Sequence, residues 1–238
     1  ETYEVSKEKT ALAITIANRE KALLQDLDYE NGYSLYVGIP FCPSICLYCS
    51  FGSHPLERWT KRVDEYLDTL CKELTFIREQ MGARKLTTVY IGGGTPTTLE
   101  PEQLRRLLSH IQETFDFTWV KEYTVEAGRP DSITREKLQV MKEFPVTRIS
   151  VNPQTMNQKT LDVIGRKHTV EDTINIFHMA RELGFDNINM DLIIGLPGEG
   201  KEEVAHTLQK VENLHPDSLT IHSLALKRAT RLNLFKDK

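Results

Sequence analysis

The sequence lacks the features that mark a membrane-spanning, secreted or nucleic-acid-binding protein. No stretch of its 238 residues approaches the roughly 18 consecutive apolar residues that a membrane-spanning helix needs. The first residues, ETYEVSKEKT, are charged and polar, so we expect no secretory signal. Lysine and arginine are scattered and the formal net charge is −4, so we do not expect nucleic acid as a partner.

Cysteine and linker segments are also scarce. The chain has four cysteines, whereas a secreted disulfide scaffold packs more of them into a shorter chain. Three of the four fall within eight residues, which favours a reducing cytoplasm and a metal or redox site. No Pro-, Gly- or Ser-rich linker divides the chain. It begins with Glu1 rather than Met, so we expect the natural protein to extend at one or both ends.

Short apolar runs alternate with longer amphipathic ones. A leading helix is predicted over 7–26, from apolar residues such as Leu12, Ile16 and Leu23 at helical spacing. Parallel βα units with right-handed connections are predicted to follow. They form an α/β fold whose sheet is either open or curled into a partial barrel. We favour one curled core domain over 34–238, preceded by a helix and connector over 1–33. The predicted strands cover 34–39, 87–91, 122–127, 147–152, 187–195 and 218–226, and the predicted helices 58–80, 101–115, 134–144, 157–164, 170–183 and 202–214.

The cysteine cluster lies directly after the first predicted strand, in YVGIPFCPSICLYCSF. Its spacing is Cys42-x3-Cys46-x2-Cys49, at the strand end where βα folds gather ligands. Iron–sulfur cubes are held by thiolates, usually four. Three thiolates leave one iron without a protein ligand, and a small molecule with an amine and a carboxylate could chelate it.

The cysteine spacing alone is also compatible with a zinc site or with no metal. Zinc takes four tetrahedral ligands, and His54 follows Cys49 closely enough to complete a Cys3His site. The three thiols could also share a buried loop without binding any metal.

The motif resembles the signature of the radical SAM superfamily, whose members cleave S-adenosylmethionine (SAM). The surrounding residues resemble its anaerobic coproporphyrinogen III dehydrogenase (HemN) family, most closely the HemZ branch. The likeness spans roughly 34–233. It is carried by IGGGTPTTL, YTVEAGRPD, VNPQTMN, IGRKHT, NMDLIIGLPGE and HPDSLTIHSLALKRATRLN.

The resemblance implies a partial (β/α)6 barrel with a [4Fe–4S] cluster on Cys42, Cys46 and Cys49. It implies reductive cleavage of SAM to methionine and a 5′-deoxyadenosyl radical. The radical then takes hydrogen from a propionate of coproporphyrinogen III, which loses carbon dioxide to leave a vinyl group during haem biosynthesis. It also implies an electron donor such as flavodoxin or ferredoxin.

Residues near SAM are assigned by the same resemblance. By themselves, the glycines of GGGTP predict either amides that face an anionic group or a tight turn. Glu126 and Asp191 interrupt apolar strands, so each needs a ligand or an ion-pair partner. The remaining polar residues would ordinarily be solvated, and the aromatic ones core. The residues assigned to SAM are Tyr36, Tyr48, Gly93, Gly94, Thr95, Glu126, Gln154, Arg166, Asp191 and Ala225, with Ala225 on the last strand.

Several positions differ from the family pattern or fall outside it. The dehydrogenases carry a further Cys where this chain has Phe51, and a His where it has Gly38. Cys71 is predicted to be a buried small hydrophobe, and His222 to be structural. Another branch of the family, haem-binding chaperones, keeps the cluster, so the sequence supports a tetrapyrrole dehydrogenase, a haem chaperone or a zinc-stabilised domain.

Overall fold

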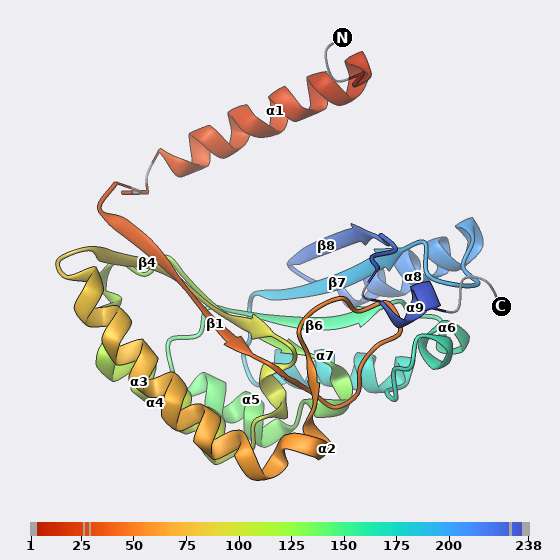
Figure 1. The fold of residues 1–238 in the computed structure, drawn as a ribbon. Coiled ribbons are helices and arrows are strands. Elements are labelled where there is room, and N and C mark those ends of the chain that lie inside the picture. The colour runs from red at the N-terminus through yellow and green to blue at the C-terminus, as the bar shows by residue number, and fades with distance from the viewer. Residues whose placement is uncertain (1–3, 26, 29, 229, 235–238) are drawn as a thin grey trace.

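A six-stranded parallel sheet forms the centre of the protein, in strand order β1-β4-β5-β6-β7-β8. The computed structural model describes residues 4–25, 27–28, 30–228 and 230–234, and the sheet curls as a half-barrel (Figure 1). The predicted α/β partial barrel is therefore confirmed. The strands are β1 (Gly32–Ile39), β4 (Lys85–Gly93), β5 (Glu122–Gly128), β6 (Arg148–Gln154), β7 (Ile188–Ile194) and β8 (Ser218–Ser223).

Helices cover one face of the sheet (Figure 1). Each follows a strand, as parallel pairing requires, and α4 buries Leu104, Leu107, Leu108 and Ile111 at helical spacing. Within the described ranges no helix is both long and apolar enough to cross a bilayer. The helices of the barrel are α3 (Val63–Met81), α4 (Pro101–Thr114), α5 (Arg135–Lys142), α6 (Gln158–Val163), α7 (Val170–Glu182) and α8 (Lys201–Leu214).

Side chains alternate between an apolar and a polar face of the sheet. Val37, Ile91 and Val125 are paired neighbours on the helix-covered face and are almost fully buried. The opposite face carries Glu126 and Asp191, among other polar groups. Burial of apolar strand residues under the helices therefore fixes the register, and the same alternation turns the carboxylates toward the inside of the half-barrel.

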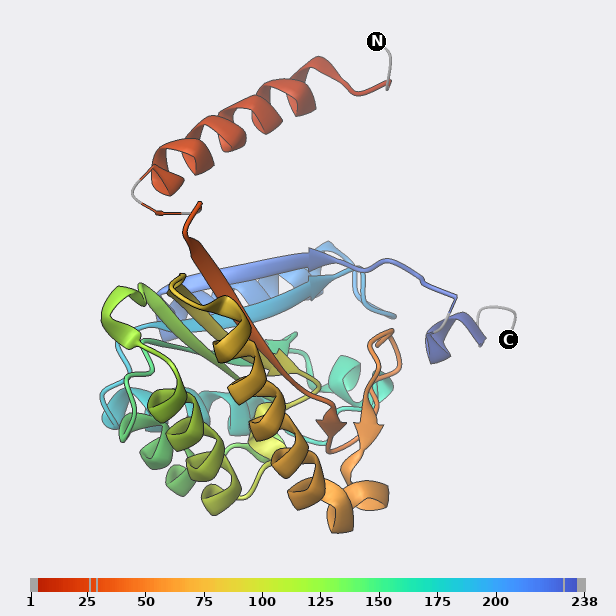
Figure 2. The same ribbon diagram turned by 60° about the vertical axis from the view of Figure 1, so that its left-hand side comes forward.

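The leading helix α1 (Lys7–Leu24) forms as predicted, but none of its faces packs against the described part of the barrel. Ser6 caps it by accepting a hydrogen bond from the Lys9 amide at 3.2 Å. None of its residues is buried, and it projects away from the sheet in both views (Figures 1 and 2). The apolar spacing predicted the helix correctly, although residue 26 lies outside the described residues.

The observed elements differ from the predicted bounds mostly by one or two residues at an end, and two of them differ by more. The helix predicted over 58–80 is divided into α2 (Leu56–Trp59), a 3-10 turn (Thr60–Arg62) and α3. Trp59, at the end of α2, packs partly against the core. The strand predicted over 218–226 ends at Ser223, where its neighbour β7 also ends. Ala225 therefore follows the last strand rather than lying on it.

Candidate functional site

A pocket of about 320 Å³ lies at the carboxyl ends of the strands, within the size range of ligand pockets. Each of the six strands contributes to its wall, either by its own last residues or by the loop that follows it. The structure thus brings together residues that are far apart in the chain. Its lining includes Cys42, Cys46, Tyr48, Cys49, Gly93, Gly94, Thr95, Glu126, Gln154, Arg166, Asp191 and Ala225.

Tyr36 is the one predicted site residue that does not line this pocket. Its ring stacks on that of Tyr90, with centroids 5.8 Å apart and planes 9° apart. The side chain is 63% exposed, so it is not a core residue either. Its assignment to SAM stays a prediction.

The cysteines lie in or beside an irregular loop, residues 43–50, here called the cysteine loop. Cys42 ends the short strand β2 (Phe41–Cys42) and is buried, as is Cys46, while Cys49 is half-buried. The Thr95 hydroxyl donates to Cys42 Sγ at 3.6 Å. Burial raises the pKa of the Cys42 thiol, so metal binding at this sulfur must release a proton.

The donor set fits an iron–sulfur cube better than a single ion. Among the described residues, no three His, Cys, Asp or Glu side chains converge as ligands of one metal ion. His54 packs instead against Trp59, with ring centroids 5.1 Å apart. In a cube each thiolate binds a different iron, so its three cysteines can stand farther apart while facing one pocket.

The glycines of the GGGTP loop are required by the fold itself. Gly93 has φ +107°, and a Cβ on Gly94 would lie 2.6 Å from the Phe41 carbonyl oxygen and 2.9 Å from that of Ile39. The Gly94 amide donates to Ile39 O at 2.7 Å and the Thr95 amide to Phe41 O at 2.8 Å. These two amides are therefore already bonded within the fold, because the loop lies close to β1 and β2. The assignment of Gly93, Gly94 and Thr95 to SAM stays a prediction.

Glu126 and Asp191 face the pocket from β5 and β7. Glu126 accepts hydrogen bonds from Asn152 Nδ2 at 2.9 Å and from Tyr90 OH at 3.5 Å, and Asp191 accepts one from Asn189 Nδ2 at 2.6 Å. In the described part of the chain, neither carboxylate forms a salt bridge with Lys or Arg. Burial, and then the charge of Asp191, raises the pKa of Glu126 to about 7.

Glu126→Gln is expected to stabilise the protein more at pH 8 than at pH 5. In the native protein the pKa of Glu126 is about 7, above the ordinary value of about 4.3. Folding therefore takes up a proton between about pH 4 and pH 7. The free-energy cost of burying the ionised carboxylate is absent below pH 4, where Glu126 is protonated in both states, and complete above pH 7, where it is ionised in both. Because the side chain borders an open pocket, we expect a gain of about 2 kcal/mol at pH 8, measured by urea unfolding at both pH values. An equal gain at both would contradict the raised pKa.

Gln154 and Arg166 are not the solvated loop residues that their sequence context suggested. Both are at most 7% exposed, and Gln154 has φ +70°. Arg166 donates to the Asn152 carbonyl at 2.6 Å and to Tyr48 OH at 3.1 Å. Its Nε has no hydrogen-bond partner among the described residues, which leaves a buried cationic donor at the pocket wall.

Several residues line the pocket although the sequence assigned them no role in binding. Arg129, in the quoted motif YTVEAGRPD, is buried and contacts the cysteine loop; a cation at a predicted strand end was the available signal. His222 lines the pocket and is exposed, contrary to the structural role expected for it. Phe51 also lines the pocket and is 71% exposed. Outside the pocket, Cys71 on α3 is half-buried rather than buried as predicted.

Comparisons with known proteins identify the family of this chain. The profile of the Radical SAM superfamily matches residues 36–211. The oxygen-independent coproporphyrinogen-III oxidase-like protein HemZ of Bacillus subtilis is 45% identical, covering 99% of this chain and 48% of HemZ. The heme chaperone HemW of B. subtilis is 38% identical, covering 83% of this chain and 52% of HemW.

A solved structure resembles this chain in both fold and sequence. The coproporphyrinogen III oxidase HemN of Escherichia coli, described as a radical SAM enzyme, superposes with a TM-score of 0.76 at 32% identity, covering 86% of this chain and 47% of HemN. The chain thus spans about half the length of the relatives it matches. The chain belongs to the radical SAM superfamily and, within it, to the family that contains HemN, HemW and HemZ.

Proposed function

We propose that residues 34–238 form a radical SAM core that holds a [4Fe–4S] cluster on Cys42, Cys46 and Cys49 and binds SAM beside it. The observation that carries the proposal is the convergence of these thiols with Glu126 and Asp191 around one pocket. A reduced cluster with SAM supplies one-electron cleavage of the sulfonium and, through it, hydrogen-atom abstraction.

The protein's own residues bind and orient SAM in this proposal. Glu126 and Asp191 accept hydrogen bonds, which suits the ammonium and hydroxyl groups of SAM, and the free Nε of Arg166 suits its carboxylate. Tyr48, held by Arg166 between two cysteines, excludes water from the cluster side. The remaining proposed contacts come from Tyr36, Gly93, Gly94, Thr95, Gln154 and Ala225.

The proposed substrate is a tetrapyrrole, coproporphyrinogen III, whose propionates lose carbon dioxide to give vinyl groups. Support comes from the names of the relatives, HemN above all. We propose a cytoplasmic location and flavodoxin or ferredoxin as the electron donor. A haem chaperone is the second candidate, favoured by the 38% identity to HemW and by Phe51 in place of the additional Cys of the dehydrogenases.

Turnover distinguishes the two candidates. The full-length protein, reconstituted anaerobically with iron and sulfide and reduced, is expected to convert SAM to 5′-deoxyadenosine. Added coproporphyrinogen III is then expected to yield vinyl products, detected by mass spectrometry. Haem binding and transfer without decarboxylation would support the chaperone instead, and a colourless zinc protein would contradict both.

A further inference from the structure

Arg129 is a buried cation that the proposed chemistry does not use. It is 3% exposed and follows Gly128 at the end of β5. Its backbone is fixed by the turn that begins at Pro130: the Ser132 amide and hydroxyl both donate to the Arg129 carbonyl, at 3.0 Å and 2.8 Å. The side chain therefore extends from a rigid part of the barrel.

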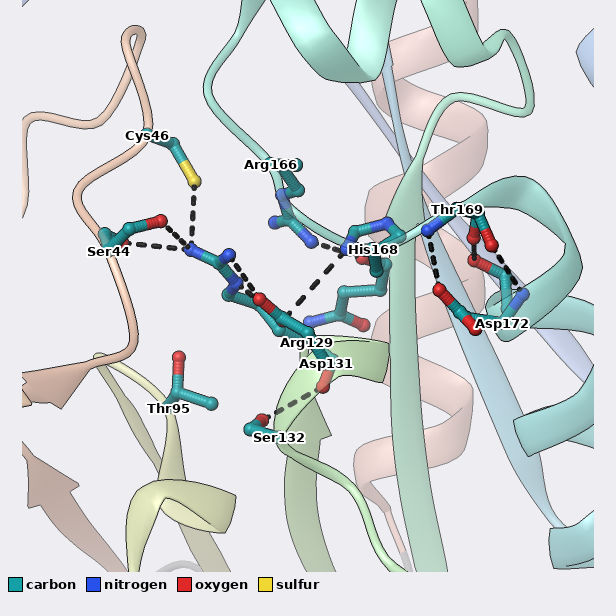
Figure 3. A network of polar contacts seen from close by, with 12 residues as sticks. Ser44, Cys46, Thr95, Arg129, Asp131, Ser132, Arg166, His168, Thr169 and Asp172 are labelled. Atoms are coloured by element: carbon teal, nitrogen blue, oxygen red, sulfur yellow. Dashed lines mark hydrogen bonds and ion pairs between the residues drawn. The ribbon is translucent and has the colours of Figure 1, made fainter.

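The guanidinium of Arg129 contacts three residues, Asp131, Ser44 and Cys46 (Figure 3). On one side Nε and Nη2 form a bidentate pair with the Asp131 carboxylate, at 2.9 Å and 2.6 Å. On the other, Nη1 lies 2.8 Å from both the carbonyl and the hydroxyl oxygen of Ser44, and 3.9 Å from Cys46 Sγ. This fork geometry is specific to arginine, since a lysine offers a single point of charge.

The cysteine loop depends on such contacts because it has no regular structure of its own. Ser44 donates a second anchoring hydrogen bond, from its hydroxyl to the Gly165 carbonyl at 3.2 Å. The Leu47 amide donates to the Ile164 carbonyl at 2.9 Å. Arg129 is the charged side chain that ties the segment before Cys46 to the end of β5.

The charge of Arg129 also lies where it can act on a cluster. Arginine keeps its charge at all accessible pH values, and Asp131 pairs with it on the side away from Cys46 (Figure 3). Behind Asp131 lies His168, fully buried, with Nδ1 4.0 Å from Asp131 Oδ1. Burial lowers the pKa of His168 to about 4, so it adds no charge at neutral pH. Nearby charge and hydrogen bonds to the sulfurs set the potentials of iron–sulfur clusters.

We propose that Arg129 is a positioning residue that fixes the Ser44–Cys46 segment and, through its charge beside Cys46, raises the reduction potential of the cluster. The proposal rests on the cluster assigned above to Cys42, Cys46 and Cys49. Adding an electron makes the cluster more negative, so a buried cation at this distance favours the reduced form. The effect is independent of which substrate the protein uses.

The test compares Arg129→Met and Arg129→Lys with Lys137→Met in the reconstituted full-length protein. Lys137 is a matched control, because it is also a buried cation and donates to Ser132 O at 3.1 Å and Thr97 O at 2.7 Å, without contacting the cysteine loop. The measurements are iron per chain, the rate of iron release to a chelator, and the potential from an EPR-monitored redox titration, all without SAM or substrate.

We expect Arg129→Met to release iron about tenfold faster or more, since a hydrogen bond from a charged group contributes at least that factor. The reduction potential of its cluster is expected to become more negative, with Arg129→Lys intermediate and Lys137→Met like wild type.

A wild-type release rate and a wild-type potential in Arg129→Met would overturn the proposal, as would equal changes in Lys137→Met. A wild-type protein without iron would instead refute the cluster assignment. If Arg129→Met fails to fold, Arg129→Gln replaces it, because glutamine removes the charge and keeps a hydrogen-bond donor. A wild-type potential in Arg129→Gln together with a wild-type release rate in Arg129→Lys then decides against the proposal.

Discussion

Cys46→Ala is expected to abolish cluster assembly and to reduce SAM cleavage by about three orders of magnitude or more, because the cofactor rather than the protein supplies the chemistry. Cys46 is buried and its sulfur lies at the pocket wall beside Arg129. Without it only Cys42 and Cys49 remain to hold the iron, and two thiolates do not anchor a cube. The measurements are iron and sulfide content, visible absorption and 5′-deoxyadenosine formed per chain.

Cys71→Ala provides the matched control. Cys71 is half-buried on α3 and is not part of the pocket lining. We expect this variant to keep a full iron content and wild-type SAM cleavage. A brown, active Cys46→Ala protein, or equal loss in both variants, would show that the three-cysteine motif does not hold the cluster.

Gly94→Ala is expected to have the largest effect on stability. The added Cβ would lie 2.6 Å from Phe41 O and 2.9 Å from Ile39 O, and backbone oxygens cannot rotate away as a flexible side chain can. Overpacking of this kind costs about 1–3 kcal/mol, and loss of the two buried amide hydrogen bonds from Gly94 and Thr95 adds about 1–3 kcal/mol. We therefore expect a loss of about 4 kcal/mol and a fall in Tm of roughly 10–15 °C.

Gly52→Ala is the control for this substitution. A Cβ on Gly52 has no neighbour within 4 Å and its φ is not in the left-handed region, so its Tm is expected to stay within about 2 °C of wild type. Because β1, β2 and the GGGTP loop meet at Gly94, the Gly94→Ala protein is also expected to incorporate less iron. Equal Tm values for the two variants, from calorimetry, would contradict the close approach of these strands.

The barrel could be predicted because its signals are local. Consecutive residues determine the short apolar runs, the amphipathic helices and the order of the βα units. These patterns predicted all six strands of the sheet. The division of the helix over 58–80 was not predicted, because apolar spacing indicates a helical face but not where the helix is interrupted. The exposure of α1 was also beyond the sequence, since apolar spacing indicates a helix but not whether anything covers it.

The site was predictable to a different extent at each residue. The Cys42, Cys46 and Cys49 spacing and the carboxylates at strand ends point to the pocket directly, because parallel strands end at one edge of a sheet. The sequence could not show that the Gly94 and Thr95 amides are already bonded, because their partners, Ile39 and Phe41, come from other strands. Arg129 looked like any polar residue, and only its burial against Ser44 and Asp131 gives it a role.

The sequence by itself determined the family, the half-barrel and the three cysteines, because each is encoded in short-range spacing and in the period of strands and helices. The tertiary structure alone decided which polar groups are buried together, which amides are already bonded, and that Tyr36 stacks on Tyr90 instead of lining the pocket. The physical reason is that desolvation, hydrogen-bond partners and steric contact are properties of neighbours in space, and parallel crossovers bring together neighbours that are far apart in the chain.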